Sequence, residues 1–290
     1  MISHPLLPKL RQLRLSTMAL TLDVRAAQAS ERQLSPLEFL ALLLDDELER
    51  RSQTRLARHF AQSGCDSQKT LALFDFSAAP GINRTRIQEL ATCGFIPRHE
   101  NILICGPTGV GKSHLANAIA CEALKRDLRV LSRPTHRFLA DLHAARASGS
   151  HARMLAKVLA VDLLILDDFG LQPISPQGAQ DLYQVLTERY EHRSMIVTSN
   201  RAFEEWADVF GDALLASAAL DRLTHHAHTL IIRGQSYRQR GRRKETAGPS
   251  PASPPSDPAE VMPEQPTYPD MWSTSRRSWV AQCGRLLTQT

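Results

Sequence analysis

The first 95 residues carry apolar side chains at the three- and four-residue spacing of helices that bury one face. One helix is predicted to begin at Ser35, whose hydroxyl is placed to accept a hydrogen bond from the backbone N–H of Glu38, and Pro36 suits the first helical position. Gly94 is expected to end the last helix of this region as a left-handed C-terminal cap. The leucines of the helix that begins at Ser35 fall on one face: Leu37, Leu40, Leu44 and Leu48.

Between residues 96 and 243, short apolar runs alternate with amphipathic segments. Strands that alternate with helices favour a parallel sheet covered by helices on both faces, which is an α/β fold. Four runs have the length and composition of buried strands: 101–105, 129–132, 163–166 and 195–198. A fifth run, within 228–233, is a candidate for one further strand.

The last part of the chain has a different composition. Eight of the 17 prolines lie between Pro249 and Pro269, mixed with serine and acidic residues. Such a segment buries too little apolar surface to fold alone, so disorder is predicted. The sequence therefore predicts a small helical N-terminal domain (1–95), an α/β domain (96–243) and a disordered, proline-rich tail (244–290).

Charge and cysteine content indicate the expected compartment of the protein more than they indicate its function. The net charge of +5 is compatible with nucleic-acid binding, but on charge alone a mildly basic protein without such a partner is favoured. The five cysteines include no CxxC pair, so they indicate neither a disulfide framework nor a zinc site. Because the chain starts without the apolar run of a signal peptide and has no stretch that could cross a bilayer, a soluble, cytoplasmic protein is expected.

A phosphate-binding motif, GxxxxGK[ST], spans Gly106 to Ser113 without mismatch, between a predicted strand and a helix predicted from Lys112 to about Arg126. Its glycines let successive backbone N–H groups face the phosphates of a nucleotide. Lys112 is expected to reach the β- and γ-phosphates, and the hydroxyl of Ser113 to bind Mg²⁺. Contacts with ATP are expected from consecutive residues: Gly106, Pro107, Thr108, Gly109, Val110, Gly111, Lys112, Ser113 and His114.

Two aspartates follow the apolar run at 163–166, where a buried strand would deliver carboxylates to a ligand crevice. Asp167 is predicted to hold Mg²⁺ and Asp168 to polarise the attacking water, although paired acids at a strand end also cap loops. Asn200 ends the next apolar run, and two interpretations stay open for it. It either contacts the hydrolytic water or the γ-phosphate, or it caps a helix that begins near Ala202.

These motifs resemble those of the IstB-like helper ATPases of bacterial insertion sequences, which are AAA+ proteins related to the DnaC-type helicase loaders. The resemblance extends to Arg238, over about four-fifths of the chain. It implies the P-loop fold of the AAA+ type. The residues that carry it, besides the phosphate-binding loop, are DDFG at 167–170, TSN at 198–200, ALDRL at 219–223 and GQSYR at 234–238.

The resemblance implies an ATPase that forms homo-oligomers on DNA and assists a transposase in selecting or preparing target DNA. ATP would lie between subunits, with Arg222 as an arginine finger that reaches the neighbour's γ-phosphate and Asn200 as sensor 1. Arg238 is a weaker match to a second sensor arginine, and a surface ion pair is the alternative for Arg222. Many family members have glutamate in place of Asp168, which puts the rate of hydrolysis in question more than ATP binding.

Basic residues near the end of the predicted α/β domain could neutralise the phosphates of duplex DNA without reading its base sequence. The alternative is that they form a solvated linker, as such runs often do. They are Arg233, Arg238, Arg240, Arg242, Arg243 and Lys244. In the N-terminal region arginines interleave with acids, so contacts with a partner or another subunit are expected there. These arginines are Arg11, Arg14, Arg25, Arg50, Arg51, Arg55 and Arg58.

A replicative helicase loader of the DnaC type is the main alternative function. It would share the ATPase core and grip a helicase through the N-terminal region. A GTPase is disfavoured because the sequence contains no NKxD motif to read guanine, and a small-molecule kinase because neither a lid nor an acceptor site is recognisable.

Overall fold

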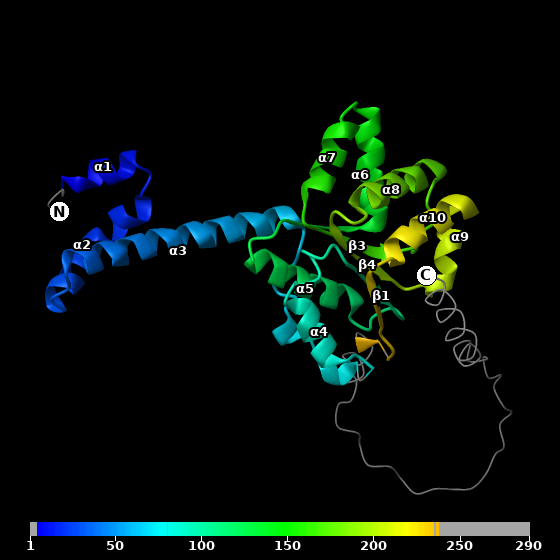
Figure 1. Cartoon of the computed structure of the whole chain (residues 1–290), viewed down its shortest axis with the longest axis horizontal. Coiled ribbons are helices and arrows are strands. Elements are labelled where there is room, and N and C mark those ends of the chain that lie inside the picture. Colours follow the sequence, from blue (N-terminus) through cyan, green and yellow to red (C-terminus); the bar gives the residue numbers. More distant parts are fainter. Residues whose placement is uncertain (1–4, 80, 235, 238–290) are drawn as a thin grey trace, which may run out of the picture. The chain divides into compact units, whose positions relative to one another are not determined.

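The structure, a computed structural model, describes residues 5–79, 81–234, 236 and 237 (Figure 1). The predicted tail at 244–290 lies outside these residues, as does the basic run from Arg238 to Lys244. Within the described part of the chain, no helix is both long enough and apolar enough to cross a membrane.

Five parallel strands form a sheet in the order β2-β3-β4-β1-β5. The predicted strands, including the candidate fifth one, are confirmed with their ends shifted by up to three residues. Because the strands are parallel, their carboxyl ends all meet at one edge of the sheet, which is where ligands bind in such folds. The strands are β1 (Asn101–Cys105), β2 (Val130–Pro134), β3 (Leu163–Phe169), β4 (Ser194–Ser199) and β5 (Ala227–Ile231).

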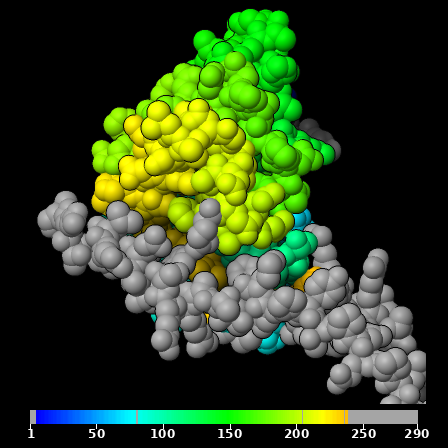
Figure 2. All heavy atoms as spheres, turned by 90° about the vertical axis from the view of Figure 1, so that its right-hand side faces the viewer, coloured from blue at the N-terminus to red at the C-terminus, as the bar shows by residue number. Residues whose placement is uncertain are grey.

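The two faces of the sheet bury separate hydrophobic clusters, because side chains alternate along each strand. In β1, Ile102 belongs to one cluster and Leu103 to the other. Helices α4 (Arg84–Ala91) and α5 (Lys112–Lys125) cover the first face, and α5 confirms the helix predicted after the phosphate-binding loop. Figure 2 shows α9 (Trp206–Phe210) and α10 (Ala213–Thr224), in yellow, at the surface of the molecule. Helices on the second face are α6 (Thr135–Ala147), α7 (His151–Ala160), α8 (Pro176–Arg189), α9 (Trp206–Phe210) and α10 (Ala213–Thr224).

The N-terminal region is helical, as predicted, with α1 (Leu6–Gln12), α2 (Ser16–Glu31) and α3 (Pro36–Ser63). The predicted capping box at the start of α3 is confirmed. The N–H of Glu38 donates to Oγ of Ser35 at 3.3 Å, and the N–H of Ser35 donates to Oε2 of Glu38 at 2.7 Å. Two backbone donors that the first helical turn leaves without partners are thereby satisfied.

The leucine face of α3 does not form the core of the N-terminal region. Helix α2 packs on the neighbouring side of α3, where Met18, Leu22 and Leu43 are buried together. Helical spacing located the apolar stripe, but the position of α2 decided which side of the helix was buried. The leucines of the stripe remain 44–78% exposed: Leu37, Leu40, Leu44 and Leu48.

The prediction that Gly94 supplies the left-handed cap is wrong. Helix α4 ends at Ala91, and Cys93 adopts the left-handed conformation, with a φ of 62°. The side chain of Cys93 is buried in the core, and its backbone N–H donates to the carbonyl of Leu90 at 3.0 Å. These contacts outweigh the roughly 1–2 kcal/mol that a non-glycine residue loses in this conformation.

Candidate active site

The predicted phosphate-binding loop joins the carboxyl end of β1 to Lys112, the first residue of α5. Gly109 and Gly111 have φ values of 85° and 96°, in the region that favours glycine. Space also requires glycine here. A Cβ on Gly111 would lie 2.8 Å from Cε2 of Phe74, and a Cβ on Gly109 would lie 2.9 Å from Cβ of Ser236. Phe74 and Ser236, which are distant from the loop in the sequence, therefore pack closely against it.

Lys112 is buried within the loop, where its Nζ donates to the carbonyl oxygens of Gly106 and Pro107, both at 2.8 Å. Burial lowers the pKa of Lys112, whereas the charges of Asp168 and Asp167 act in the opposite direction. Hydrogen bonds between ionised partners are roughly twice as strong as neutral ones. An anionic phosphate would therefore compete well with the two carbonyls for this ammonium group.

Ser113 and Asp167 meet at the carboxyl edge of the sheet. The hydroxyl of Ser113 donates to Oδ1 of Asp167 at 2.9 Å, and the hydroxyl of Thr198 on β4 contacts the same oxygen. A carboxylate beside hydroxyl groups offers the hard oxygen ligands that Mg²⁺ prefers, so these residue types fit the predicted metal. Thr198 had no predicted role of its own, although it belongs to TSN at 198–200, one of the stretches that carry the family resemblance.

Asp168 lies at an irregularity in β3, where the register with β4 shifts between Leu166 and Phe169. Its φ is 54°, and its backbone N–H donates to Oγ1 of Thr198 at 3.0 Å. Bulges of this kind redirect side chains, and they are frequent beside active sites. Asp168 also borders a groove of about 420 Å³ between α6 and α8, which gives this carboxylate access to solvent.

Asn200 directly follows β4, which lies between the strand of the phosphate-binding loop and the strand of Asp167. The interpretation of Asn200 as a helix cap is wrong, because the next element, η3 (Phe203–Glu205), has Ala202 as its N-cap. The side chain of Asn200 is half-buried at the carboxyl edge of the sheet. This position leaves contact with a bound nucleotide or water as the remaining prediction for it.

Arg222 lies at the opposite edge of the sheet. The side chain of Asn101, the first residue of β1, donates to the carbonyl of Leu223 at 3.2 Å, so the end of α10 lies beside the start of β1. The phosphate-binding loop begins where β1 ends, five residues further on. At about 3.3 Å per residue, the strand separates Arg222 from the loop of its own chain by roughly 16 Å.

The guanidinium of Arg222 is held in place by neighbours from its own chain. Its Nη1 donates to the carbonyl of Ala218 at 2.8 Å, and its Cζ lies 5.3 Å from the centre of the Tyr183 ring. The alternative of a surface ion pair finds no support, because Arg222 has no acidic partner within the described residues.

The remaining members of the predicted site contact one segment before β1 and one after β5, of which only the second contains a predicted motif, GQSYR at 234–238. Nε2 of His114 lies 2.9 Å from the carbonyl oxygen of Thr70, and its ring stands edge-on to Phe74 at 5.4 Å. On the other side, the N–H of Tyr237 donates to the carbonyl of Gly109 at 3.0 Å. The chain before β1 and the chain after β5 therefore flank the loop. Arg238, the candidate second sensor, lies outside the described residues.

Comparison with solved structures identifies the fold. A DNA replication initiation factor matches with a TM-score of 0.51 and 22% identity, over 63% of this chain and 55% of that one. The DnaI structure matches with a TM-score of 0.50 and 22% identity, over 58% of this chain and 92% of that one. These similarities show the predicted P-loop fold of the AAA+ type.

Comparison of sequences identifies the family. The ATP-binding protein of insertion sequence IS21 from Pseudomonas aeruginosa is 38% identical over 241 residues, which are 83% of this chain and 91% of that protein. The ATP-binding protein of insertion sequence IS5376 from Geobacillus stearothermophilus is 38% identical over 80% of this chain and 92% of its own length. The model of the IstB-like ATP binding proteins matches residues 8–245. The chain therefore belongs to the family of IstB-like ATP binding proteins.

Proposed function

We propose that the protein binds ATP with Mg²⁺ and hydrolyses it between the subunits of a homo-oligomer that assists a transposase on duplex DNA. One observation carries the ATPase part of this proposal. Lys112, Ser113 and Asp167 converge at the carboxyl edge of the sheet, where a cation, a hydroxyl and a carboxylate match a triphosphate and its metal ion.

Each residue of the site has a separate role in this proposal. Lys112 exchanges its two carbonyl partners for phosphate oxygens, and Ser113 and Asp167 hold Mg²⁺, which neutralises charge on the phosphates. Asp168 orients the attacking water or accepts its proton. Asn200, at the end of the next strand, positions that water. Phe74 and His114 line the approach to the loop on the side of the N-terminal segment.

Catalysis between subunits is supported by the position of Arg222. An arginine finger stabilises the charge that develops on the transferred phosphoryl group. Since the end of α10 lies at the opposite edge of the sheet from the loop of its own chain, the proposed partner of the Arg222 guanidinium is the γ-phosphate bound by a neighbouring subunit. ATP would then join two copies of the chain, which makes assembly depend on the nucleotide.

The part of the proposal that concerns DNA rests on the relatives and on charge. The relatives are named for the insertion sequences that encode them, and the chain has a net charge of +5. The arginines of the N-terminal region and those after β5 are the proposed contacts with DNA, partner or subunit. The division into 1–95, 96–243 and 244–290 belongs to the same proposal.

A helicase loader remains the second candidate, because DnaI shares the fold. The two functions differ in the protein partner. Pull-down of the full chain with the transposase of its own insertion sequence, against pull-down with a hexameric replicative helicase, separates them. Capture of the helicase alone would favour the loader.

The direct test is ATP hydrolysis by the purified full chain with Mg²⁺, with and without duplex DNA, together with the size of the complex in solution. The proposal expects turnover that depends on Mg²⁺, stimulation by DNA and a large assembly on DNA with ATP. A folded protein without measurable affinity for adenine nucleotides in the presence of Mg²⁺ would contradict it.

A further inference from the structure

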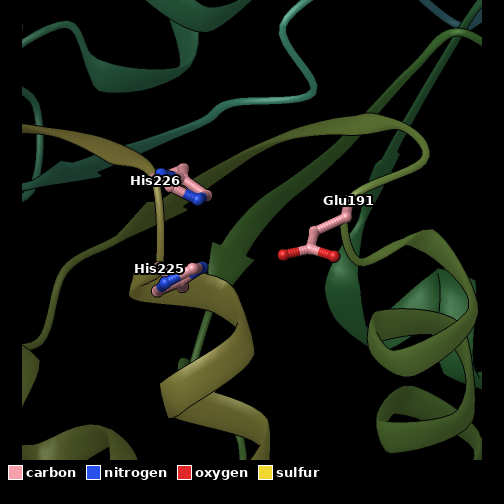
Figure 3. Close-up of side chains that lie close together, drawn as sticks. All are labelled: Glu191, His225 and His226. Carbon is pink, nitrogen blue, oxygen red and sulfur yellow. The ribbon is translucent and has the colours of Figure 1, made fainter.

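Two histidines and a glutamate gather at the edge of the sheet where β4 and β5 begin, away from the nucleotide site. Glu191 follows α8, and His225 and His226 join α10 to β5. Figure 3 shows the carboxylate of Glu191 directed toward the two imidazoles. One ligand atom from each residue lies within 4.8 Å of the other two, and all three residues are exposed.

We propose that Glu191, His225 and His226 bind one divalent ion of the zinc class, which ties the end of α8 to the end of α10. Imidazole nitrogen selects zinc, nickel or copper over magnesium, and two histidines with one carboxylate are an established ligand set for zinc. The fourth position around the ion is open to water. The oxygen ligands of Asp167 and Ser113 suit Mg²⁺ instead, so the two sites would select different metals.

The distances are compatible with one ion. Zinc binds nitrogen and oxygen ligands at about 2.0–2.2 Å, which places the ligands of a tetrahedral site roughly 3.3 Å apart. The three ligand atoms therefore need to approach one another by at most about 1.5 Å from the 4.8 Å limit. Because the side chains are exposed, small rotations about their side-chain bonds suffice, and no packed core opposes them.

The neighbours of the cluster hold it in an arrangement suited to a metal. The hydroxyl of Tyr190 lies 2.8 Å from Nδ1 of His225. When Nε2 of His225 binds an ion, Nδ1 keeps its proton and donates a hydrogen bond to this hydroxyl. Most metal-bound histidines make such an outer contact through their second ring nitrogen. The rings of His225 and His226 are 4.0 Å apart between centres, so the two imidazoles are already adjacent.

The backbone of the cluster is strained. Glu191 and His226 have φ values of 57° and 56°, although neither is glycine. Left-handed conformations of non-glycine residues are strained and concentrate at functional sites. Here they occur in the two loops that present the ligands, and His225 follows Arg222 by three residues. An ion would thus add to the contacts that already join α8 and α10, which include Arg222 with Tyr183 and Tyr190 with His225.

The test is a titration of the metal-free full chain with Co²⁺ in excess Mg²⁺, because cobalt in a low-coordinate site of nitrogen and oxygen ligands absorbs visible light. We expect one equivalent to bind, and Zn²⁺ to displace it and to raise the melting temperature. His225→Ala and His226→Ala should each remove the absorption. Tyr190→Phe, which removes only the outer contact, should weaken binding about 10–100-fold.

Two controls separate this site from other metal binding. His192→Ala changes an exposed histidine next to Glu191 and should leave the absorption unchanged. Asp167→Asn should also leave it unchanged, so the result is independent of the nucleotide site. The proposal is overturned if the unmodified chain develops no visible absorption, or if His192→Ala lowers cobalt binding as much as His225→Ala does.

Discussion

Ser113 and Asp167 stand 54 positions apart in the chain, yet the hydroxyl of Ser113 donates a 2.9 Å hydrogen bond to the carboxylate of Asp167. The contact arises because α5 begins, and β3 ends, at the same edge of the parallel sheet. Thr198 on β4 contacts the same carboxylate oxygen and so fixes its direction. The pair forms one side of the proposed nucleotide site, and Lys112 forms the other.

Replacement of Lys112 by alanine should weaken ATP binding at least about tenfold, because a hydrogen bond to a charged group contributes roughly 1.5–3 kcal/mol. Titration with a fluorescent ATP analogue in the presence of Mg²⁺ measures the change. Lys125→Ala is the matched control, since Lys125 ends the same helix and is exposed beside Glu122. Equal affinities of the two variants for the ATP analogue would show that Lys112 does not contribute to nucleotide binding.

Asp168→Asn should bind ATP normally and turn it over about 10²–10⁴-fold more slowly, which is the usual contribution of a general base. Asparagine tolerates a positive φ, so the variant keeps the backbone at 54°. Turnover and nucleotide affinity are measured on the same preparation. Unchanged turnover would exclude Asp168 as the base.

Arg222→Ala should lose hydrolysis about 10³–10⁵-fold while each subunit still binds ATP. The loss should be repaired in mixtures with Lys112→Ala subunits, which bind ATP poorly but retain Arg222. Arg193→Ala, a half-buried arginine paired with Asp162, serves as the control. Mixed oligomers that assemble without regaining activity would contradict action between subunits.

Gly64→Ala should destabilise the protein by more than Gly149→Ala. Both glycines have positive φ values, 75° and 68°, so alanine costs roughly 1–2 kcal/mol at each. A Cβ at Gly64 would also lie 2.6 Å from the backbone oxygen of Ser132, whereas nothing lies within 4 Å at Gly149. Thermal unfolding of both variants measures the difference. Equal losses would show that the end of α3 does not pack closely on β2.

The lowered pKa of Glu100 predicts that the stability of the folded protein depends on pH. A hydrogen bond from Arg98, assisted by His228 at 2.8 Å, lowers the pKa of Glu100 from 4.5 to about 2. Because the pKa is lower in the folded state, the stabilisation is complete above pH 4.5 and is lost as the pH falls toward 2. Glu100→Gln should therefore be less stable than the unmodified chain at pH 7.

The difference between Glu100→Gln and the unmodified chain should shrink below pH 4.5, as urea unfolding across this range measures. Glu31→Gln, at the exposed end of α2, should show no such difference. A constant difference between pH 7 and pH 2.5 would show that the loss in Glu100→Gln does not come from its charge.

Features that depend on consecutive residues were predictable from the sequence. The phosphate-binding loop, the capping box at Ser35 and the apolar runs of the strands depend on spacing and residue type within a few positions. Alternation of strands and helices then determines a parallel sheet, and with it the edge at which Asp167 meets Ser113. The fold class and the centre of the candidate site follow from these local patterns.

Tertiary packing decided the features that join distant positions. It placed Phe74 against Gly111 and Tyr190 against His225, and no local pattern encodes such pairs. It buried Leu43 rather than the leucine stripe of α3, because burial depends on where α2 lies. It also placed Arg222 at the far edge of the sheet, since the direction of α10 relative to β1 is a property of the whole sheet and not of the residues around Arg222.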